Sequence, residues 1–260
     1  MMILDKIIET KIEEVALLKN TATLSTLRNA IADLPPCRNF RAAISSGSCS
    51  IIAEVKCASP SRGRLVEHFD PLSIAKIYEQ NGAAAISVLT DERYFCGHKD
   101  YLTQIRNTVQ IPVLRKDFII DPLQIYETRA MGADAVLLIV RVLGRNLDGY
   151  ISLCRELGLH SLVEVHTQDE LDVALEAGAD IIGVNNRNLD TFETDIHTSI
   201  RLKSRIPGDR MAVAESAIRS RRDIEVLMNA GIHAFLIGEG LVTASDIGRK
   251  LRMFLGEEPS

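Results

Sequence analysis

Short apolar runs alternate with longer amphipathic stretches along most of the chain. Four of the runs cover residues 50–55, 112–116, 161–165 and 211–215, and each is followed by positions with helical periodicity. Runs this short and this apolar are typical of strands that are buried on both faces, as in a parallel sheet covered by helices. The pattern therefore predicts strands alternating with helices.

An internal repeat indicates how many strands there are. A helical stretch stops and an apolar run follows at Gly82, Gly132, Gly178 and Gly231, at intervals of about 50 residues. Each interval is long enough for two strand–helix units, and the four runs above supply the second strand of each. Eight such units close a (β/α)8 TIM barrel. A doubly wound open sheet is the alternative, but no G-x-G-x-x-G motif follows the first strand.

Residues 1–48 precede the first predicted strand. Their apolar positions fall at helical spacing between acidic residues, namely Ile3, Leu4, Ile7, Ile8, Ile12 and Val15. This segment is predicted to be a helical extension that packs on the barrel. Because no linker or low-complexity tract interrupts the chain, we expect one domain over residues 1–260, with 1–48 as the extension.

Composition and charge narrow the function classes. The chain has 260 residues and a net charge of −5, whereas nucleic-acid binding favours a basic face. The longest strongly apolar run, 135–140, is far shorter than the roughly 20 residues of a membrane span. The acidic N-terminal helix suits no targeting peptide. We therefore expect a cytoplasmic protein without nucleic-acid or membrane partners; its oligomeric state is open, with a monomer favoured.

Cysteines and histidines give no sign of a metal. The five cysteines form no C-x-x-C pair and are odd in number, so free thiols are expected in place of disulfides or a zinc knuckle. The six histidines lack the spacing that would place two ligands on one ion. The sequence therefore predicts no metal site.

Charged and polar side chains stand at the carboxyl ends of five predicted strands, where barrel active sites form. Together they are Glu54, Lys56, Lys116, Glu164, Asn185 and Glu215. Glu54 and Lys56 are two residues apart and share a strand face, so burying them costs several kcal/mol per ion unless they are paired or used. A buried ion pair without function is the alternative there, but the recurrence on five strands predicts an active-site ring.

Lys116 is the strongest candidate for proton transfer. A partly dry pocket disfavours the ammonium form, so we expect a pKa below the ordinary lysine value. Its neighbours Arg115 and Asp117 lie on the opposite strand face and are expected to serve structure.

Three loops suggest a phosphate site. Ser216 and Ala217 follow the seventh strand and Gly238 and Glu239 follow the eighth, positions from which barrels present backbone N–H groups to phosphate. The loop at 59–64 after the first strand is basic and long, as a lid over an anion would be.

These residues resemble those of the indole-3-glycerol-phosphate synthase family over nearly the whole chain. The most specific stretches are IAEVKCASPS at 52–61, VLTDERYF at 88–95, LRKDF at 114–118, GVNNRNL at 183–189 and VAES at 213–216. The resemblance implies a (β/α)8 lyase of tryptophan biosynthesis that needs no cofactor. Its substrate would be the phosphorylated small molecule 1-(2-carboxyphenylamino)-1-deoxyribulose 5-phosphate, closed to indole-3-glycerol phosphate with loss of carbon dioxide and water.

The resemblance also implies roles for the proton-transfer groups. Lys116 would be the general acid that protonates the ketone during ring closure, and Glu164 would handle the second proton transfer. Glu54 and Lys56 would act in dehydration or anchor the substrate carboxylate; their division of roles is open.

The remaining roles concern binding. Asn185 and Glu215 would hold substrate hydroxyls and orient the lysines, while Arg187 would bind substrate or fix its own loop. The ring wall would consist of Phe95, Phe118 and Leu236; the alternative for both phenylalanines is a place among the core aromatics. The phosphate would be held by Ser59, Ser216, Ala217, Gly238 and Glu239, largely through backbone N–H groups.

One residue departs from the family pattern. Ala217 stands where the family usually has glycine, which costs roughly 1 kcal/mol if that position requires a positive φ. Two competing functions remain: another phosphate-binding barrel, such as a sugar-phosphate isomerase or Schiff-base aldolase using Lys116 or Lys56, or a barrel that only binds.

Overall fold

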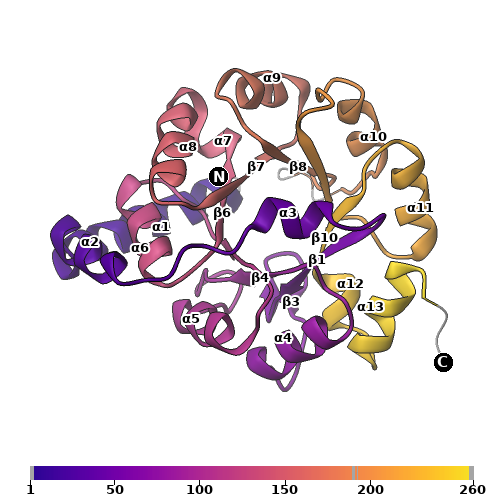
Figure 1. The fold of residues 1–260 in the computed structure, drawn as a ribbon, viewed down its shortest axis with the longest axis horizontal. Coiled ribbons are helices and arrows are strands. Elements are labelled where there is room, and N and C mark those ends of the chain that lie inside the picture. Colours follow the sequence, from indigo (N-terminus) through magenta and orange to yellow (C-terminus); the bar gives the residue numbers. More distant parts are fainter. Residues whose placement is uncertain (1–2, 189–190, 192, 258–260) are drawn as a thin grey trace.

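The computed structural model describes residues 3–188, 191 and 193–257, so Leu189 of the family-like stretch lies outside it. Eight parallel strands form a closed barrel in the order β1-β10-β9-β8-β7-β6-β5-β4, surrounded by helices (Figure 1). This confirms the predicted (β/α)8 fold, and closure of the ring excludes the open sheet. The strands are β1 (Ser50–Val55), β4 (Ala85–Leu89), β5 (Val113–Lys116), β6 (Ala135–Ile139), β7 (His160–Val165), β8 (Ile181–Asn185), β9 (Met211–Glu215) and β10 (Ala234–Ile237).

Helices follow the strands on the outside of the barrel. They are α4 (Pro71–Gln80), α5 (Lys99–Thr108), α6 (Pro122–Ala130), α7 (Val140–Leu143), α8 (Leu147–Glu156), α9 (Gln168–Glu176), α10 (His197–Lys203), α11 (Arg221–Asn229), α12 (Glu239–Val242) and α13 (Ile247–Leu255), with a 3-10 turn η1 (Gly144–Asn146) between α7 and α8. The repeat glycines do end their helices: Gly82, Gly132, Gly178 and Gly231 all adopt a left-handed φ between 77° and 90°.

The N-terminal extension contains three helices, α1 (Ile3–Thr21), α2 (Leu24–Ala32) and α3 (Phe40–Ser45). The short helix α3 closes the end of the barrel at which the strands begin, and Figure 1 views the molecule from this end. Phe40 and Ile44 are buried there against interior residues of the barrel such as Leu114 and Leu162. The amino end of the barrel is thus filled with apolar side chains, which leaves the carboxyl end for polar ones.

A buried ionic cluster fixes α1 on the barrel. Lys11 is 1% exposed, and its Nζ lies 2.9 Å from both Asp91 and Asp117. Asp117 also pairs with Arg115, which reaches Glu127 of α6. Arg115 and Asp117 thus belong to a buried ionic cluster, as their strand face predicted, although Asp117 also lines the pocket. The pairing explains why charged groups can be buried so deeply here.

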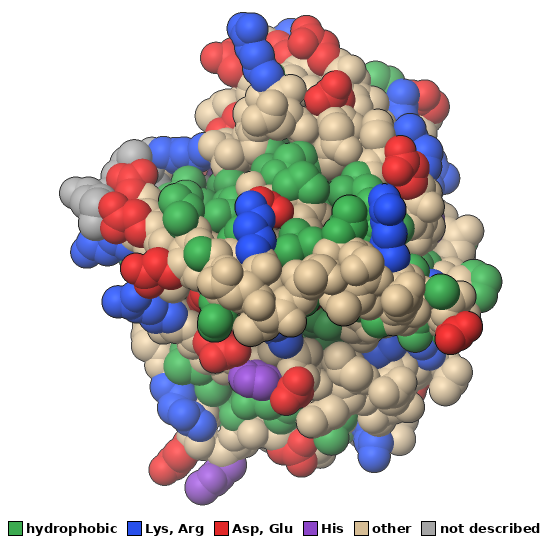
Figure 2. All heavy atoms as spheres, turned by 90° about the vertical axis from the view of Figure 1, so that its left-hand side faces the viewer, with side chains coloured by type: hydrophobic (Ala, Val, Ile, Leu, Met, Phe, Trp, Pro, Cys, Tyr) green, Lys and Arg blue, Asp and Glu red, His purple; other side chains and the backbone are tan. Residues whose placement is uncertain are grey.

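Acidic and basic side chains are mixed on the outer surface. The face that carries α2 shows both signs scattered around a group of hydrophobic side chains (Figure 2). Ile12, Leu17 and Leu24 of α1 and α2 are among the large apolar residues that remain exposed. In the described ranges, no helix is long and apolar enough to cross a bilayer.

Candidate active site

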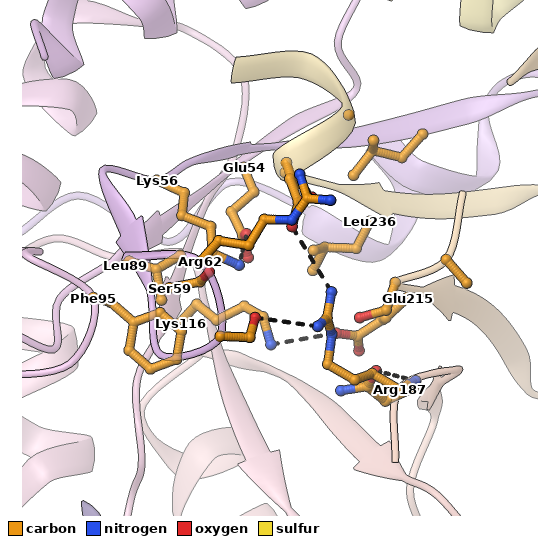
Figure 3. A pocket seen from close by; sticks show the side chains of 18 of the residues that line it. Glu54, Lys56, Ser59, Arg62, Leu89, Phe95, Lys116, Arg187, Glu215 and Leu236 are labelled. Atoms are coloured by element: carbon orange, nitrogen blue, oxygen red, sulfur yellow. Dashed lines mark hydrogen bonds and ion pairs between the residues drawn. The ribbon is translucent and has the colours of Figure 1, made fainter. Parts of the chain in front are cut away.

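One pocket of about 640 Å³ lies where the barrel strands end. It brings together every residue that the sequence analysis assigned to catalysis, substrate binding or phosphate binding. The parallel strands end at the same end of the barrel, and side chains from several of them converge on this pocket, so residues distant in sequence become neighbours (Figure 3).

Lys116 lies among carboxylates in the middle of this pocket. Its Nζ is 3.1 Å from Oε2 of Glu164 and 3.3 Å from Oε2 of Glu215. Both carboxylates are almost fully buried, because they project inward from β7 and β9. Figure 3 shows the ammonium directed toward Glu215. The arrangement places one cation between two acids.

The expected direction of the Lys116 pKa was wrong. Burial on its own lowers this pKa, but the charges of Glu164, Glu215 and Glu54 together raise it well above the ordinary value. The expected pKa took account of desolvation in the pocket but not of the three carboxylates that surround the lysine in the folded protein. Lys116 is therefore held as an ammonium ion, able to give a proton.

The pKa values of Glu164 and Glu215, the two carboxylates beside Lys116, are shifted in opposite directions. Burial raises both; for Glu164 the charges of Lys116 and His166 outweigh it, so its pKa is lowered. For Glu215, burial together with the charges of Glu164 and Glu54 outweighs Lys116 and raises the pKa to about 7. One carboxylate is thus ionised near neutrality while the other exchanges protons, which is a common arrangement in acid–base sites.

Glu54 and Lys56 form a second ion pair at the end of β1. Lys56 Nζ lies 3.1 Å from Oε1 of Glu54 and 5.6 Å from the centre of the Phe95 ring. Glu54 is buried, whereas Lys56 is 18% exposed and faces the pocket. The pair is therefore not sealed in the core, and Lys56 is available to a ligand.

Two glycines make room for the buried carboxylates. A Cβ on Gly183 would collide with the carboxylate of Glu215, and one on Gly238 would collide with that of Glu54. Gly238 was singled out for phosphate binding, but its neighbour in the structure is this catalytic candidate. The absence of a side chain at Gly238 therefore leaves space for the carboxylate of Glu54 as well as for the turn of the loop.

Apolar side chains form one wall of the pocket. Buried Leu236 lines the pocket together with Phe95 and Phe118. The two phenylalanine rings are 6.1 Å apart at 35°, and both are partly exposed. They are therefore not ordinary core aromatics. Leu89, Leu137 and Ile139 extend the same wall. A planar aromatic ring fits such a surface.

The loops after β9 and β10 present free backbone donors. The amide N–H groups of Ser216, Ala217 and Glu239 make no backbone hydrogen bond in the part of the chain that is described. Ser216 and Ala217 both have φ of 63°, so the position where the family has glycine does require a left-handed backbone. Successive N–H groups in such a turn form a concavity suited to an anion. The buried Ser59 Oγ, which also has no partner among the described residues, faces the same pocket.

The basic loop after β1 folds over this side of the pocket. Its ends pair as a small hairpin of β2 (Ala58–Ser59) and β3 (Gly63–Arg64). Arg62 is held 2.9 Å from Glu239, and Arg187 reaches both Glu239, at 3.8 Å, and Ser61. Arg64 instead donates to backbone carbonyls of its own loop and does not line the pocket. Arg62 and Arg187 of these loops, but not Arg64, thus line the pocket near Glu239.

Asn185 connects the carboxylate of Glu164 with the loop that carries Arg187. Its Oδ1 accepts the backbone N–H of Arg187 at 3.0 Å, and its side chain also hydrogen-bonds Glu164. Asn185 therefore orients Glu164 and begins the turn that carries Arg187 toward Glu239.

Helix α1 and His166 contribute to the site although neither was predicted to do so from the sequence. Ile3, Leu4 and Ile7 of α1 line the pocket, although their spacing predicted only a packed helix. His166 contacts Glu164 from behind at 3.4 Å. The apolar periodicity of α1 and the position of His166 just after β7 can be read from the sequence. The position of α1 over the pocket cannot, because it depends on the folded barrel. Within the described residues, no cluster of histidine, cysteine and acidic side chains could hold a metal ion.

A closed parallel barrel with acid–base groups at its carboxyl end places the chain among the (β/α)8-barrel proteins. Solved structures agree on the fold: a 3-hexulose-6-phosphate synthase superposes with a TM-score of 0.65 at 13% identity, covering 80% of this chain and 98% of that one. A thiamine phosphate pyrophosphorylase from Pyrococcus furiosus gives 0.63 at 13% identity, covering 84% and 96%. Such distant likeness shows the fold alone.

Closer relatives identify the family. The family model for indole-3-glycerol phosphate synthase matches residues 4–254. An indole-3-glycerol phosphate synthase from Chlorobaculum tepidum is 53% identical over 94% of this chain and 96% of its own length. One from Desulforamulus reducens is 48% identical over 96% of each. The chain belongs to the indole-3-glycerol phosphate synthase family, whose members are decarboxylating, ring-closing lyases.

Proposed function

We propose that Lys116 is the general acid of the family's ring closure, in which 1-(2-carboxyphenylamino)-1-deoxyribulose 5-phosphate becomes indole-3-glycerol phosphate. The supporting observation is its ammonium group, which lies between Glu164 and Glu215 in a pocket with an apolar wall. A protonated lysine there can donate to the ketone oxygen while the anilino ring carbon attacks the ketone carbon. The ring carboxylate then leaves as carbon dioxide.

Dehydration requires an acid for the departing hydroxyl and a base for the proton lost from carbon. We assign these transfers to Glu164 and to the Glu54–Lys56 pair, whose ammonium faces the pocket. Glu164 suits the base, because the charge of Lys116 keeps its pKa low against the effect of burial. Lys56 suits either the dehydration acid or the anchor for the substrate carboxylate before it leaves.

Substrate hydroxyls would be held by Asn185 and Glu215. Oε1 of Glu215 has no hydrogen-bond partner among the described residues, and Oε2 has only the ammonium of Lys116 at 3.3 Å, so the carboxylate can also accept a hydrogen bond from a ligand. Arg187 lies at the pocket rim, where it would bind substrate while paired with Glu239. The anilino ring would pack against Phe95, Phe118 and Leu236, whose rings and methyl groups exclude water from the reacting carbons.

The phosphate would occupy the opposite end of the pocket. Ser216, Ala217, Gly238 and Glu239 would offer backbone N–H groups, and Ser59 would add its unpartnered hydroxyl. Arg62 would neutralise the phosphate once it releases Glu239. The acidic side chain of Glu239 serves here to hold both arginines in place.

The direct test is to mix the purified chain with the anilino-deoxyribulose phosphate and to follow indole fluorescence without added metal or nucleotide. Appearance of product supports the assignment, and absence of product contradicts it. Borohydride added during turnover tests the aldolase alternative, because a trapped covalent adduct on Lys116 or Lys56 would replace ring closure by Schiff-base chemistry.

We further propose that residues 1–260 act as one domain and as a cytoplasmic monomer. The pocket is lined by residues from α1 to α13, so the extension and the barrel contribute to one site, which supports a single domain. Light scattering at micromolar concentration tests the monomeric state: a mass near 28.7 kDa is expected, and a dimer would contradict it.

A further inference from the structure

Behind the pocket, Glu164 contacts a histidine to which the proposed reaction assigns no role. Nε2 of His166 lies 3.4 Å from Oε1 of Glu164, while Oε2 of the same carboxylate is 3.1 Å from Lys116. On its other side, Nδ1 of His166 is 3.1 Å from Oε2 of Glu170. Lys116, Glu164, His166 and Glu170 therefore form one continuous line of ionisable groups.

Glu170 fixes the histidine from two directions. Its Oε2 accepts the backbone N–H of His166 at 2.7 Å as well as contacting Nδ1 of the ring. Glu170 stands in the first turn of α9, which is capped by Thr167. The ring orientation is thus set by the start of the helix that follows β7, and Nε2 is directed at Glu164.

The line leads outward from the reacting groups. Glu164 is 3% exposed, His166 is 8% exposed and Glu170 is 16% exposed. Lys116 and Glu164 line the pocket, whereas His166 and Glu170 do not. A substrate that fills the pocket would cover Lys116 and leave Glu170 as the end of the line that reaches solvent.

A purely structural role would leave part of this arrangement unexplained. Capping of α9 accounts for Glu170 and for the backbone of His166. It does not account for Nε2, which is buried, faces a carboxylate and makes no hydrogen bond within the described residues. The charges that act on this ring favour its protonated form: burial lowers the pKa of His166, but Glu170, Glu164 and Glu215 together raise it.

The proposed reaction consumes a proton in each turnover. Lys116 gives one to the ketone oxygen, an acid gives a second to the departing hydroxyl, and a base recovers one from carbon. The carboxylate leaves as neutral carbon dioxide, so one proton must enter from solvent for the charges to balance. The proton that Glu164 takes from carbon can restore only one of the two acids, so the other must be restored from solvent. Lys116 gives its proton first and is covered by substrate, so its route from solvent must run through the protein.

We propose that His166, oriented by Glu170, is a positioning residue that holds Glu164 and returns protons through it to Lys116. In this transfer the Nε2–H bond of the imidazolium breaks and an O–H bond forms on Oε1 of Glu164. The carboxyl group then turns so that this O–H faces Lys116, on the side where Oε2 lies now, and gives its proton to the neutral amine. The imidazole is protonated again from solvent beside Glu170. This inference rests on the role of Lys116 proposed above.

Two variants test the transfer. His166→Gln keeps a hydrogen-bond donor but cannot titrate, and Glu170→Gln keeps an oxygen for the backbone N–H but removes the charge. Steady-state indole fluorescence should show kcat lowered about 10-fold to 100-fold in His166→Gln, less than for the general acid itself, with KM changed by less than about threefold. Glu176→Gln, on the exposed side of α9, is the matched control.

The pH profile distinguishes proton transfer from structural support. In the wild type, kcat should fall as pH rises through the pKa of His166, because the imidazolium is the active form. Glu170→Gln should move this limb to lower pH, since a charge that raises the pKa of His166 is removed, and His166→Gln should abolish it. A limb that does not move, or a loss of kcat that is equal at all pH values, overturns the inference.

Failure of the inference and failure of the proposed function give different results. If the wild type forms no product, the proposed function is wrong. If the wild type forms product and His166→Gln matches it at every pH, only the role of His166 is wrong. Circular dichroism and thermal unfolding of each variant exclude a folding defect as the cause of lost activity.

Discussion

At the residue scale, the charges around Lys116 decide between two chemistries. An ammonium ion can donate a proton, whereas Schiff-base formation requires a neutral amine. Glu164, Glu215 and Glu54 raise the pKa of Lys116 despite its burial, and this favours the general acid. The carboxylates around Lys116 thus contradict the lowered pKa expected from burial, but they support the role of general acid that the family resemblance implied.

Replacing this ammonium should remove most of the activity. We expect Lys116→Met to lower kcat by about 10²-fold or more, the scale of a lost general acid, with KM affected less. Steady-state indole fluorescence measures it, with Lys76→Met on the exposed face of α4 as the control. A kcat close to that of the wild type would remove Lys116 from this role.

Ala217 provides a second test at this scale. Its φ of 63° strains a residue that carries a Cβ, by about 1 kcal/mol, and the strain outweighs the greater freedom that glycine has in the unfolded chain. Ala217→Gly should therefore raise the free energy of unfolding by roughly 0.5–1 kcal/mol. Denaturant unfolding measures the change.

The matched control for that substitution is Ala42→Gly in α3, where the helical backbone should give the opposite sign. The turn conformation already places the N–H groups, so we expect the KM for substrate to stay unchanged. A lower stability of Ala217→Gly would show that the left-handed backbone is not strained, and a changed KM would show that the substitution is not neutral for phosphate binding.

At the element scale, α1 belongs to the active site although it lies outside the barrel. Its apolar face supplies Ile3, Leu4 and Ile7 to the pocket, while Lys11 fixes it to Asp91 and Asp117 beyond β4 and β5. Asp117 directly follows Lys116 in sequence. The attachment of the extension and the position of the general acid therefore depend on the same short segment.

Removal of the Lys11 charge should loosen this element. Lys11→Met leaves Asp91 buried without its cation, while Asp117 keeps Arg115; an unpaired buried charge of this kind costs roughly 3–5 kcal/mol. We expect lower stability in denaturant unfolding, faster proteolysis within residues 20–40 and a higher KM. Lys6→Met, at an exposed position of the same helix, should change none of these. Equal protease resistance of both variants would contradict the anchoring role.

At the scale of the whole molecule, the fold was more predictable than the electrostatics. The glycine repeat and the apolar runs fixed the number of strands, because each strand–helix unit is a local pattern repeated along the chain. The ring of polar residues was predictable for the same reason: the end of each strand is a local feature. The pKa of Lys116, the contact of His166 with Glu164 and the place of α1 depend on neighbours that only closure of the barrel brings together.

The opposite pKa shifts of the buried carboxylates should make the free energy of unfolding depend on pH. The pKa of Glu215 is raised to about 7, so the folded state binds more protons than the unfolded state between its ordinary pKa and that value. Its contribution is complete at low pH and is lost as pH rises through about 7. Glu164 and Asp117, whose pKa values are lowered, contribute in the opposite direction and lose their contribution as pH falls.

Glu215→Gln isolates the first of these effects, because the amide stays neutral at every pH. Relative to the wild type, the variant should gain stability as pH rises from about 5 to about 8, by up to about 3 kcal/mol. Urea unfolding at several pH values measures the difference, with Glu13→Gln on the exposed face of α1 as the control. A difference that stays constant with pH would mean that Glu215 is ionised throughout, in which case Lys116 lies between two full negative charges.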